Sequence, residues 1–98
     1  MHAVVNRLRL SEPIPPDVWS RAQAEVPPLA REVPGFKALH VIEISDDEVV
    51  LVVLADSAET LDRVATEVGN SWMRENVIPY LAGPPDRQIG KVVASSDD

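Results

Sequence analysis

Residues 36–56 read FKALHVIEISDDEVVLVVLAD, and this stretch decides the fold. Up to Ser45 the side chains alternate between two sets, a period of two that predicts a β-strand. Asp46-Asp47 is a turn signal, because both side chains can hydrogen-bond their own backbone. The next segment, residues 48–56, is nearly all β-branched or leucine and predicts a central strand covered on both faces.

A helix is predicted before these strands. Pro16 suits the first turn of a helix, and apolar residues then recur at three- and four-residue steps along one stripe. Pro27-Pro28 interrupts the stripe, so we expect a kink or two consecutive short helices. Gly35 closes the element.

A second helix is predicted after them. Ser57 is a good N-cap, and apolar residues follow at helical spacing until Gly69. Asn70 or Ser71 can then cap a further short helix that runs through Ile78. In the sequence, one predicted helix therefore precedes the two strands of residues 36–56 and the other follows them.

Outer strands are predicted over residues 3–10 and 88–94. The order βαββαβ predicts an α+β, ferredoxin-like domain over residues 1–94, with two helices on one face of a four-stranded antiparallel sheet. The acidic tail, residues 95–98, has nothing to bury and is expected to fray.

Such a sheet has one uncovered face, which mixes apolar residues with both signs of charge. The alternation assigns to it Ala3, Val5, Arg7, Arg9, Lys37, Leu39, Val41 and Glu43. Two copies that meet face to face about a two-fold axis would bury this surface, so we expect a homodimer.

Composition excludes several function classes. The chain has 98 residues, 9 Lys+Arg against 16 Asp+Glu, a net charge of −7 and no cysteine. This charge argues against nucleic acid and anionic membranes as partners, and the lack of cysteine excludes zinc ribbons and thiol nucleophiles. With no signal peptide or membrane-spanning run, a cytoplasmic location is expected.

Asn6 is the first candidate site residue, because the alternation places an amide on the helix-covered face between Val4 and Leu8. A buried amide must find partners. These are either a structural hydrogen bond or a ligand in a cavity between sheet and helices.

Three ring side chains are further candidates. His40 is predicted to share the helix-covered face with Phe36, where it is either an acid–base group or a satisfied core residue. Trp72 and Tyr80 lie where a pocket mouth is expected, although packing explains them equally well, and Trp19 is predicted to be a core anchor. No zinc or triad spacing is present, so no metal site is expected.

Three short motifs resemble one family: Asn-Arg-Leu at residues 6–8, Pro-Gly-Phe at 34–36 and Asp-Ser-Ala-Glu at 56–59. Together with the element order they are similar to dimeric α/β-barrel proteins of the antibiotic biosynthesis monooxygenase type. The resemblance implies a homodimer with one pocket per subunit. Some members oxygenate aromatic or quinol-like substrates without metal or flavin, so the resemblance implies no cofactor.

A haem-degrading branch of that family uses an Asn on the first strand and a Trp and a His on the second helix. Asn6 matches, but the Trp position falls on Val64 and the His position near Trp72 and Met73. The sequence has no His after residue 40, so this mode of haem ligation lacks its donor. Two function classes remain: a cofactor-independent monooxygenase, and a non-catalytic dimeric module that binds a small molecule or stabilises an assembly.

Overall fold

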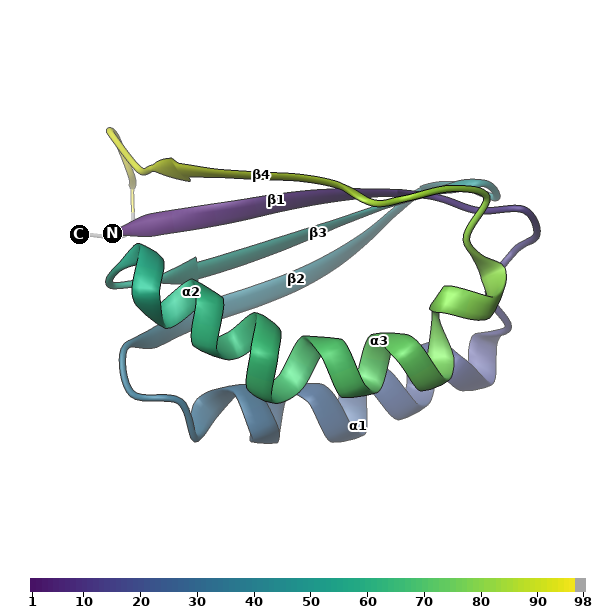
Figure 1. Ribbon diagram of the computed structural model, residues 1–98, viewed down its shortest axis with the longest axis horizontal. Helices are drawn as coiled ribbons and strands as arrows, with labels where there is room; N and C mark the ends of the chain where they lie inside the picture. Colours follow the sequence, from purple (N-terminus) through teal and green to yellow (C-terminus); the bar gives the residue numbers. More distant parts are fainter. Residues whose placement is uncertain (97–98) are drawn as a thin grey trace.

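The computed structural model describes residues 1–96. Its strands are β1 (His2–Arg9), β2 (Phe36–Ser45), β3 (Glu48–Ala55) and β4 (Asp86–Lys91); its helices are α1 (Pro16–Arg31), α2 (Ala58–Val64) and α3 (Asn70–Asn76), with a π-helical turn η1 (Ala65–Gly69) and a 3-10 turn η2 (Ile78–Tyr80). The strands form one antiparallel sheet in the order β2-β3-β1-β4. All helices lie on one face of it (Figure 1). The predicted α+β, ferredoxin-like fold is confirmed.

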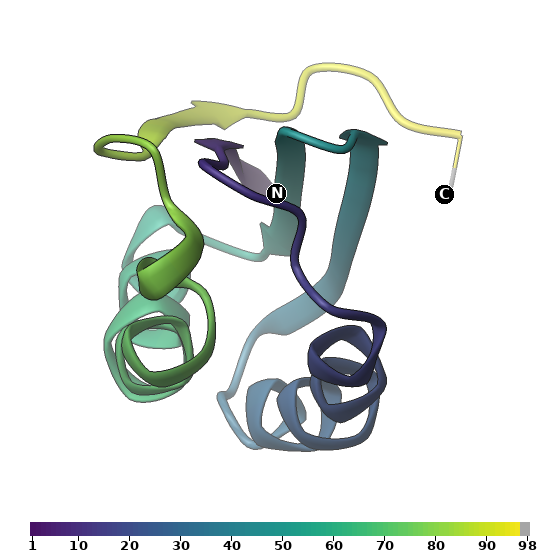
Figure 2. The ribbon, with the colours of Figure 1, turned by 90° about the vertical axis from the view of Figure 1, so that its right-hand side faces the viewer.

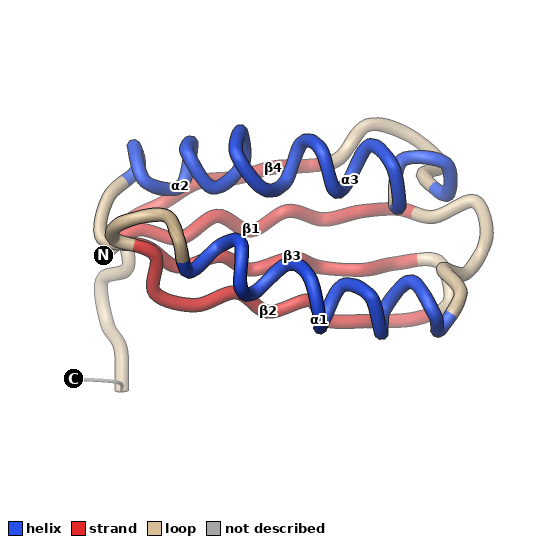
Figure 3. Tube along the Cα trace, turned by 90° about the horizontal axis from the view of Figure 1, so that it is seen from below, coloured by secondary structure: helices blue, strands red, loops and turns tan. Residues whose placement is uncertain are grey.

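The two helical segments cover different halves of the sheet. The α2–η1–α3 segment lies under the side of β4 and β1, and α1 lies under the side of β2 (Figures 2 and 3). The other face of the sheet carries no element of residues 1–96, as Figure 1 shows. We call it the open face.

Pro27 and Pro28 lie inside α1, which is one continuous helix. Of the two predicted alternatives, the division into two short helices is therefore wrong, and the kink stays a prediction. The two prolines leave the carbonyls of Gln23 and Ala24 without their helical donors. Both of these residues are exposed, and water can therefore satisfy their carbonyls.

The sequence predicts that the second helix ends at Gly69, and this prediction is wrong. Gly69 has helical dihedral angles, and the chain passes through the π-helical turn directly into α3, without a side-chain cap. The buried stripe explains this continuity, because Val64 and Val68 are buried and Trp72 follows four residues later on the same side.

The pairing of β2 with β3 shows which side chains of β2 face the helices. Phe36 pairs with Ala55 and Leu39 pairs with Val53, so three steps on β2 match two steps on β3. The extra residue is a β-bulge, and it reverses the alternation of β2 as far as Glu43, after which a second bulge restores it at Ser45. Because paired residues share a face, the bulge places Leu39, Val41 and Glu43 on the helix-covered face and Ala38, His40 and Ile42 on the open face.

The predicted open face is therefore confirmed for β1 and wrong for β2. Leu39 packs against the buried core, as its place on the helix-covered face requires. On β1 and β3, alternate residues point to the open face: Ala3, Val5, Arg7, Arg9, Glu48, Val50, Val52 and Leu54. Arg7 and Glu48 form an ion pair across this face, with Nε and Oε2 3.6 Å apart.

Two apolar clusters lie between the sheet and the helices. One contains Leu61, which is 1% exposed, and lies toward the beginning of α2; the other contains Val49 and Val77 and lies toward α3. Among residues 1–96 no helix is long and apolar enough to cross a membrane. The division into a domain, residues 1–94, and a tail, residues 95–98, stays a prediction, and residues 97 and 98 lie outside the described part of the chain.

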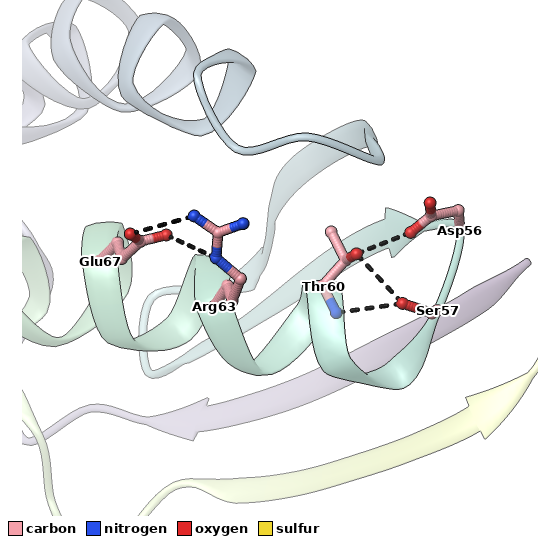
Figure 4. Close-up of polar contacts among 5 residues, drawn as sticks. All are labelled: Asp56, Ser57, Thr60, Arg63 and Glu67. Atoms are coloured by element: carbon pink, nitrogen blue, oxygen red, sulfur yellow. Dashed lines mark hydrogen bonds and ion pairs between the residues drawn. The ribbon is translucent and has the colours of Figure 1, made fainter.

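Ser57 caps α2 as predicted, since its Oγ accepts a hydrogen bond from the Thr60 backbone N–H at 3.2 Å. The Thr60 hydroxyl donates to Asp56 Oδ1 at 2.7 Å (Figure 4). This hydrogen bond is the main cause that lowers the pKa of the Asp56 carboxyl below its ordinary value, with help from Ser57 and the positive charge of Lys37.

Thr60→Val is expected to raise the pKa of Asp56 toward the unfolded value, because valine has the shape of threonine without its hydroxyl. In the native protein the lowered pKa stabilises the fold above the unfolded pKa, and this stabilisation is lost as the pH falls through the folded pKa. The variant should lose less stability on the acid side. NMR titration of the Asp56 carboxyl carbon tests this, with Thr66→Val, at an exposed threonine, as the control. An unchanged Asp56 titration in Thr60→Val would contradict it.

Candidate functional site

A cavity of about 1540 Å³ lies between the sheet and the helices. Its floor includes Val4, Asn6 and Leu8 of β1, and its walls include Trp19 of α1 and Trp72 of α3. The lining is mostly apolar with a few polar groups, which is typical of sites for small organic molecules.

Asn6 lies on the helix-covered face, as predicted, and lines this cavity. Its Oδ1 is buried and has no hydrogen-bond partner among residues 1–96. Its neighbours across the sheet are Leu51 on β3 and Arg87 on β4. The Arg87 guanidinium extends to Asp62 Oδ1, 3.4 Å away. A buried amide oxygen beside an open volume is a position at which a ligand hydroxyl or N–H can donate.

Trp72 also lines the cavity, but its indole N–H already has a hydrogen-bond acceptor. The Trp72 indole N–H donates to Glu25 Oε2 of α1 at 3.3 Å. Beside it, Arg21 Nη1 donates to Asn76 Oδ1 at 2.7 Å. These two contacts join α1 to α3, so Trp72 contributes its ring to the cavity wall rather than its N–H to a ligand.

His40 is not on the helix-covered face, and that prediction is wrong. It pairs with Val52 after the bulge, so its exposed imidazole points to the open face, although β2 borders the cavity at this position. His40 is nevertheless among the residues that border the cavity, so its acid–base role stays a prediction.

Tyr80 lies in η2 and packs against the Val49–Val77 cluster. Its carbonyl accepts hydrogen bonds from the backbone N–H and the hydroxyl of Ser11. Within residues 1–96 it is not part of the cavity lining. Of its two open interpretations, packing is the one that the geometry favours.

Trp19 is the site residue that sequence reasoning missed. It packs against the Val49–Val77 cluster, in agreement with its prediction as a core anchor, but it also lines the cavity. Its Nε1 is buried without an acceptor in the part of the chain that the structure describes. The sequence offers no signal for this second role, because a tryptophan on the apolar stripe of a helix is normally a core residue.

Among residues 1–96, no group of three or more His, Cys, Asp or Glu side chains could hold a metal ion.

No protein-family model matches the sequence. Part of it is similar to type II secretion system protein L of Vibrio cholerae serotype O1 (strain ATCC 39315 / El Tor Inaba N16961), with 44% identity over 69 residues. That segment covers 69% of this chain and 17% of the relative. The match therefore spans about one sixth of that protein's length.

Several solved structures share the whole fold. A candidate antibiotic biosynthesis monooxygenase from Nitrosomonas europaea superposes with a TM-score of 0.72 at 14% identity, covering 96% of this chain and 100% of that one. SnoaB, a cofactor-independent oxygenase from Streptomyces nogalater, also gives 0.72, at 12% identity over 99% and 97% of the two chains. The ActVA-Orf6 monooxygenase of Streptomyces coelicolor, solved with nanaomycin D, gives 0.68 at 21% identity over 96% and 92%. This chain therefore has the ferredoxin-like fold of the antibiotic biosynthesis monooxygenase type.

Proposed function

We propose that this protein is a cofactor-independent monooxygenase that acts on a small aromatic or quinol-like metabolite in the cavity between helices and sheet. One observation carries the proposal: Asn6 lines a cavity of about 1540 Å³, and its Oδ1 is buried without a partner among residues 1–96. The fold it shares with SnoaB, a cofactor-independent oxygenase, supports it.

In this chemistry the substrate itself reduces O2, without a cofactor. A substrate that gives a proton to solvent and becomes a carbanion transfers an electron to O2 directly. The two radicals combine at carbon to give a hydroperoxide, which loses water and leaves one oxygen atom on the ring as a carbonyl. The protein has to bind the substrate, shield the reacting atoms and stabilise charge. Asn6 would accept a hydrogen bond from the substrate hydroxyl and fix its orientation. Apolar side chains of the cavity wall, among them Leu51 and Val53, would keep the reacting atoms dry.

The open face supports a homodimer as part of this proposal. Val5 and Ile42 are 42% and 44% exposed on it, and Val50, Val52 and Leu54 extend the apolar area between them. A sheet face of this composition is normally covered. A second copy fits it by symmetry and pairs its mixed charges. The cytoplasmic location, and the absence of nucleic-acid and membrane partners, remain predictions.

Asn6→Ala is expected to lower the rate of substrate-dependent O2 uptake by up to about tenfold, the effect of losing one hydrogen bond from the substrate hydroxyl. The same variant should be as stable as the native protein or more so, because it removes a buried oxygen that has no partner within residues 1–96. An oxygen electrode with hydroquinones and naphthols measures the first quantity, and urea unfolding measures the second.

Two results would contradict the proposal: native uptake rates in Asn6→Ala, or no uptake by the native protein with any compound. If Asn6→Ala lowers both the stability and the O2 uptake rate, Asn6 serves the fold and not the substrate.

A second candidate is a non-catalytic dimeric module. Its support is the similarity to a protein named as part of a secretion system, type II secretion system protein L. A dimer that consumes no O2 with the whole panel would favour it. Haem degradation ranks lower, because the two histidines of the chain are His2 and His40, and neither lies on the helices that line the cavity.

A further inference from the structure

The two tryptophans of the cavity wall differ in the state of their indole N–H groups. Trp72 donates to Glu25, whereas Trp19 Nε1 is buried with no acceptor among residues 1–96. An indole nitrogen can donate but cannot accept, so Trp19 needs an oxygen or nitrogen acceptor. The cavity that its side chain lines is the volume from which such an acceptor can come.

Charge is distributed unevenly around this cavity. The whole chain has 16 acidic and 9 basic residues. Among residues 1–96, the charged residues of the lining are Arg31, Lys37, Arg74 and Arg87, with Glu43 as the single carboxylate. Arg87 is paired with Asp62, but Arg31, Lys37 and Arg74 still outnumber Glu43 in the lining, and this excess of positive charge attracts anions.

The two buried polar atoms complement each other. Asn6 Oδ1 comes from the sheet and accepts, while Trp19 Nε1 comes from α1 and donates. A ligand that satisfies both must present a hydroxyl toward the sheet and an acceptor oxygen toward α1. The excess of cations selects an ionised acceptor over a neutral one.

We propose that Trp19 is a specificity-determining residue, whose indole N–H binds an ionised oxygen of a hydroxylated aromatic acid while Asn6 binds the hydroxyl of the same ligand. The proposal deepens the proposed function, since it uses the same cavity and names the class of ligand. It concerns binding, and its test does not require turnover.

The experiment is calorimetric titration with 6-hydroxy-2-naphthoate, which has a hydroxyl and a carboxylate at opposite ends. Two matched probes lack one group each: methyl 6-hydroxy-2-naphthoate and 2-naphthoate. Trp19→Phe should weaken binding of the hydroxy acid by roughly tenfold and binding of the ester by less than threefold, as expected for one charge-assisted hydrogen bond. Asn6→Ala should instead remove the preference for the hydroxy acid over 2-naphthoate.

Tyr80→Phe is the matched control, since it removes one polar group from an aromatic ring that, within residues 1–96, is not part of the cavity lining. It should leave the preference for acid over ester unchanged. The proposal is overturned if Trp19→Phe weakens acid and ester equally, if it binds both as the native protein does, or if the native protein fails to bind the hydroxy acid at millimolar concentration.

Failure of the proposed function gives a different pattern. If none of the quinols is oxidised but the acid preference depends on Trp19, the cavity is a binding site for aromatic acids without the oxygenase reaction. If quinols are oxidised and Trp19→Phe keeps the native acid preference, the function holds and the role of Trp19 does not.

Discussion

Val5→Asp is expected to separate the proposed homodimer into monomers. Val5 lies in the middle of the open face, where it is 42% exposed and pairs with Val52 on β3 and Gln88 on β4. In a single chain an aspartate at this position remains in water and costs little. In a face-to-face dimer it would be a buried charge without a partner, because Arg7, the cation nearest in sequence on this face, already pairs with Glu48.

Such a charge costs about 3–5 kcal/mol, which raises the dimer dissociation constant at least about a hundredfold. Sedimentation velocity over a range of concentrations measures this change, with the monomer at 10.7 kDa. Leu29→Asp is the matched control, because Leu29 is 44% exposed but lies on α1, away from the open face. A Val5→Asp protein that sediments as the native dimer does, or a native protein that is a monomer, would contradict the interface.

The same interface shows where sequence reasoning succeeds and where it fails. On β1 the apolar and polar sets are distinct, since Val4 and Leu8 alternate with Arg7 and Arg9, and the predicted faces are correct. On β2 both sets of alternating residues are largely apolar, so the sequence does not show which set faces the helices. One inserted residue near Lys37 then moves His40 from the cavity side to the open face.

The start of the second helix could be predicted because local signals in the sequence determine it. Caps and breakers act locally, and Ser57 starts the second helix as expected. Gly69 is a local breaker too, but the continued burial of the stripe from Val64 to Val68 outweighs its weak helix propensity. Tertiary packing thus decides the outcome at the position where local and long-range preferences conflict.

In the site, too, one residue could be predicted from the sequence and another could not. Asn6 is visible in the sequence because an amide interrupts an apolar stripe. Trp19 is not visible, because a tryptophan on the apolar stripe of a helix is an ordinary core residue. What distinguishes Trp19 from Trp72 is whether a carboxylate lies within reach of the indole N–H, and that depends on how α1 and α3 pack.

Gly35→Ala is expected to destabilise the fold by about 3 kcal/mol, the largest effect on stability among the substitutions considered. Gly35 joins α1 to β2 with a φ of +90°, a conformation that an L residue adopts only with strain. A β-carbon at this position would also overlap the carboxylate of Asp56. To make room, Asp56 must rotate away from Thr60 and lose the hydrogen bond that lowers its pKa.

The two costs can be separated experimentally. Gly83→Ala is the control, because a β-carbon at Gly83 meets no atom within 4 Å among the residues described and its φ is not positive. Urea unfolding at one fixed protein concentration should show little change for Gly83→Ala. Combined with Thr60→Val, which has already removed the hydrogen bond to Asp56, Gly35→Ala should cost less than it does alone. A Gly35→Ala protein within about 0.5 kcal/mol of the native stability would show that this turn tolerates a side chain. Equal costs in both backgrounds would assign the whole effect to the backbone, because the carboxylate would then contribute nothing.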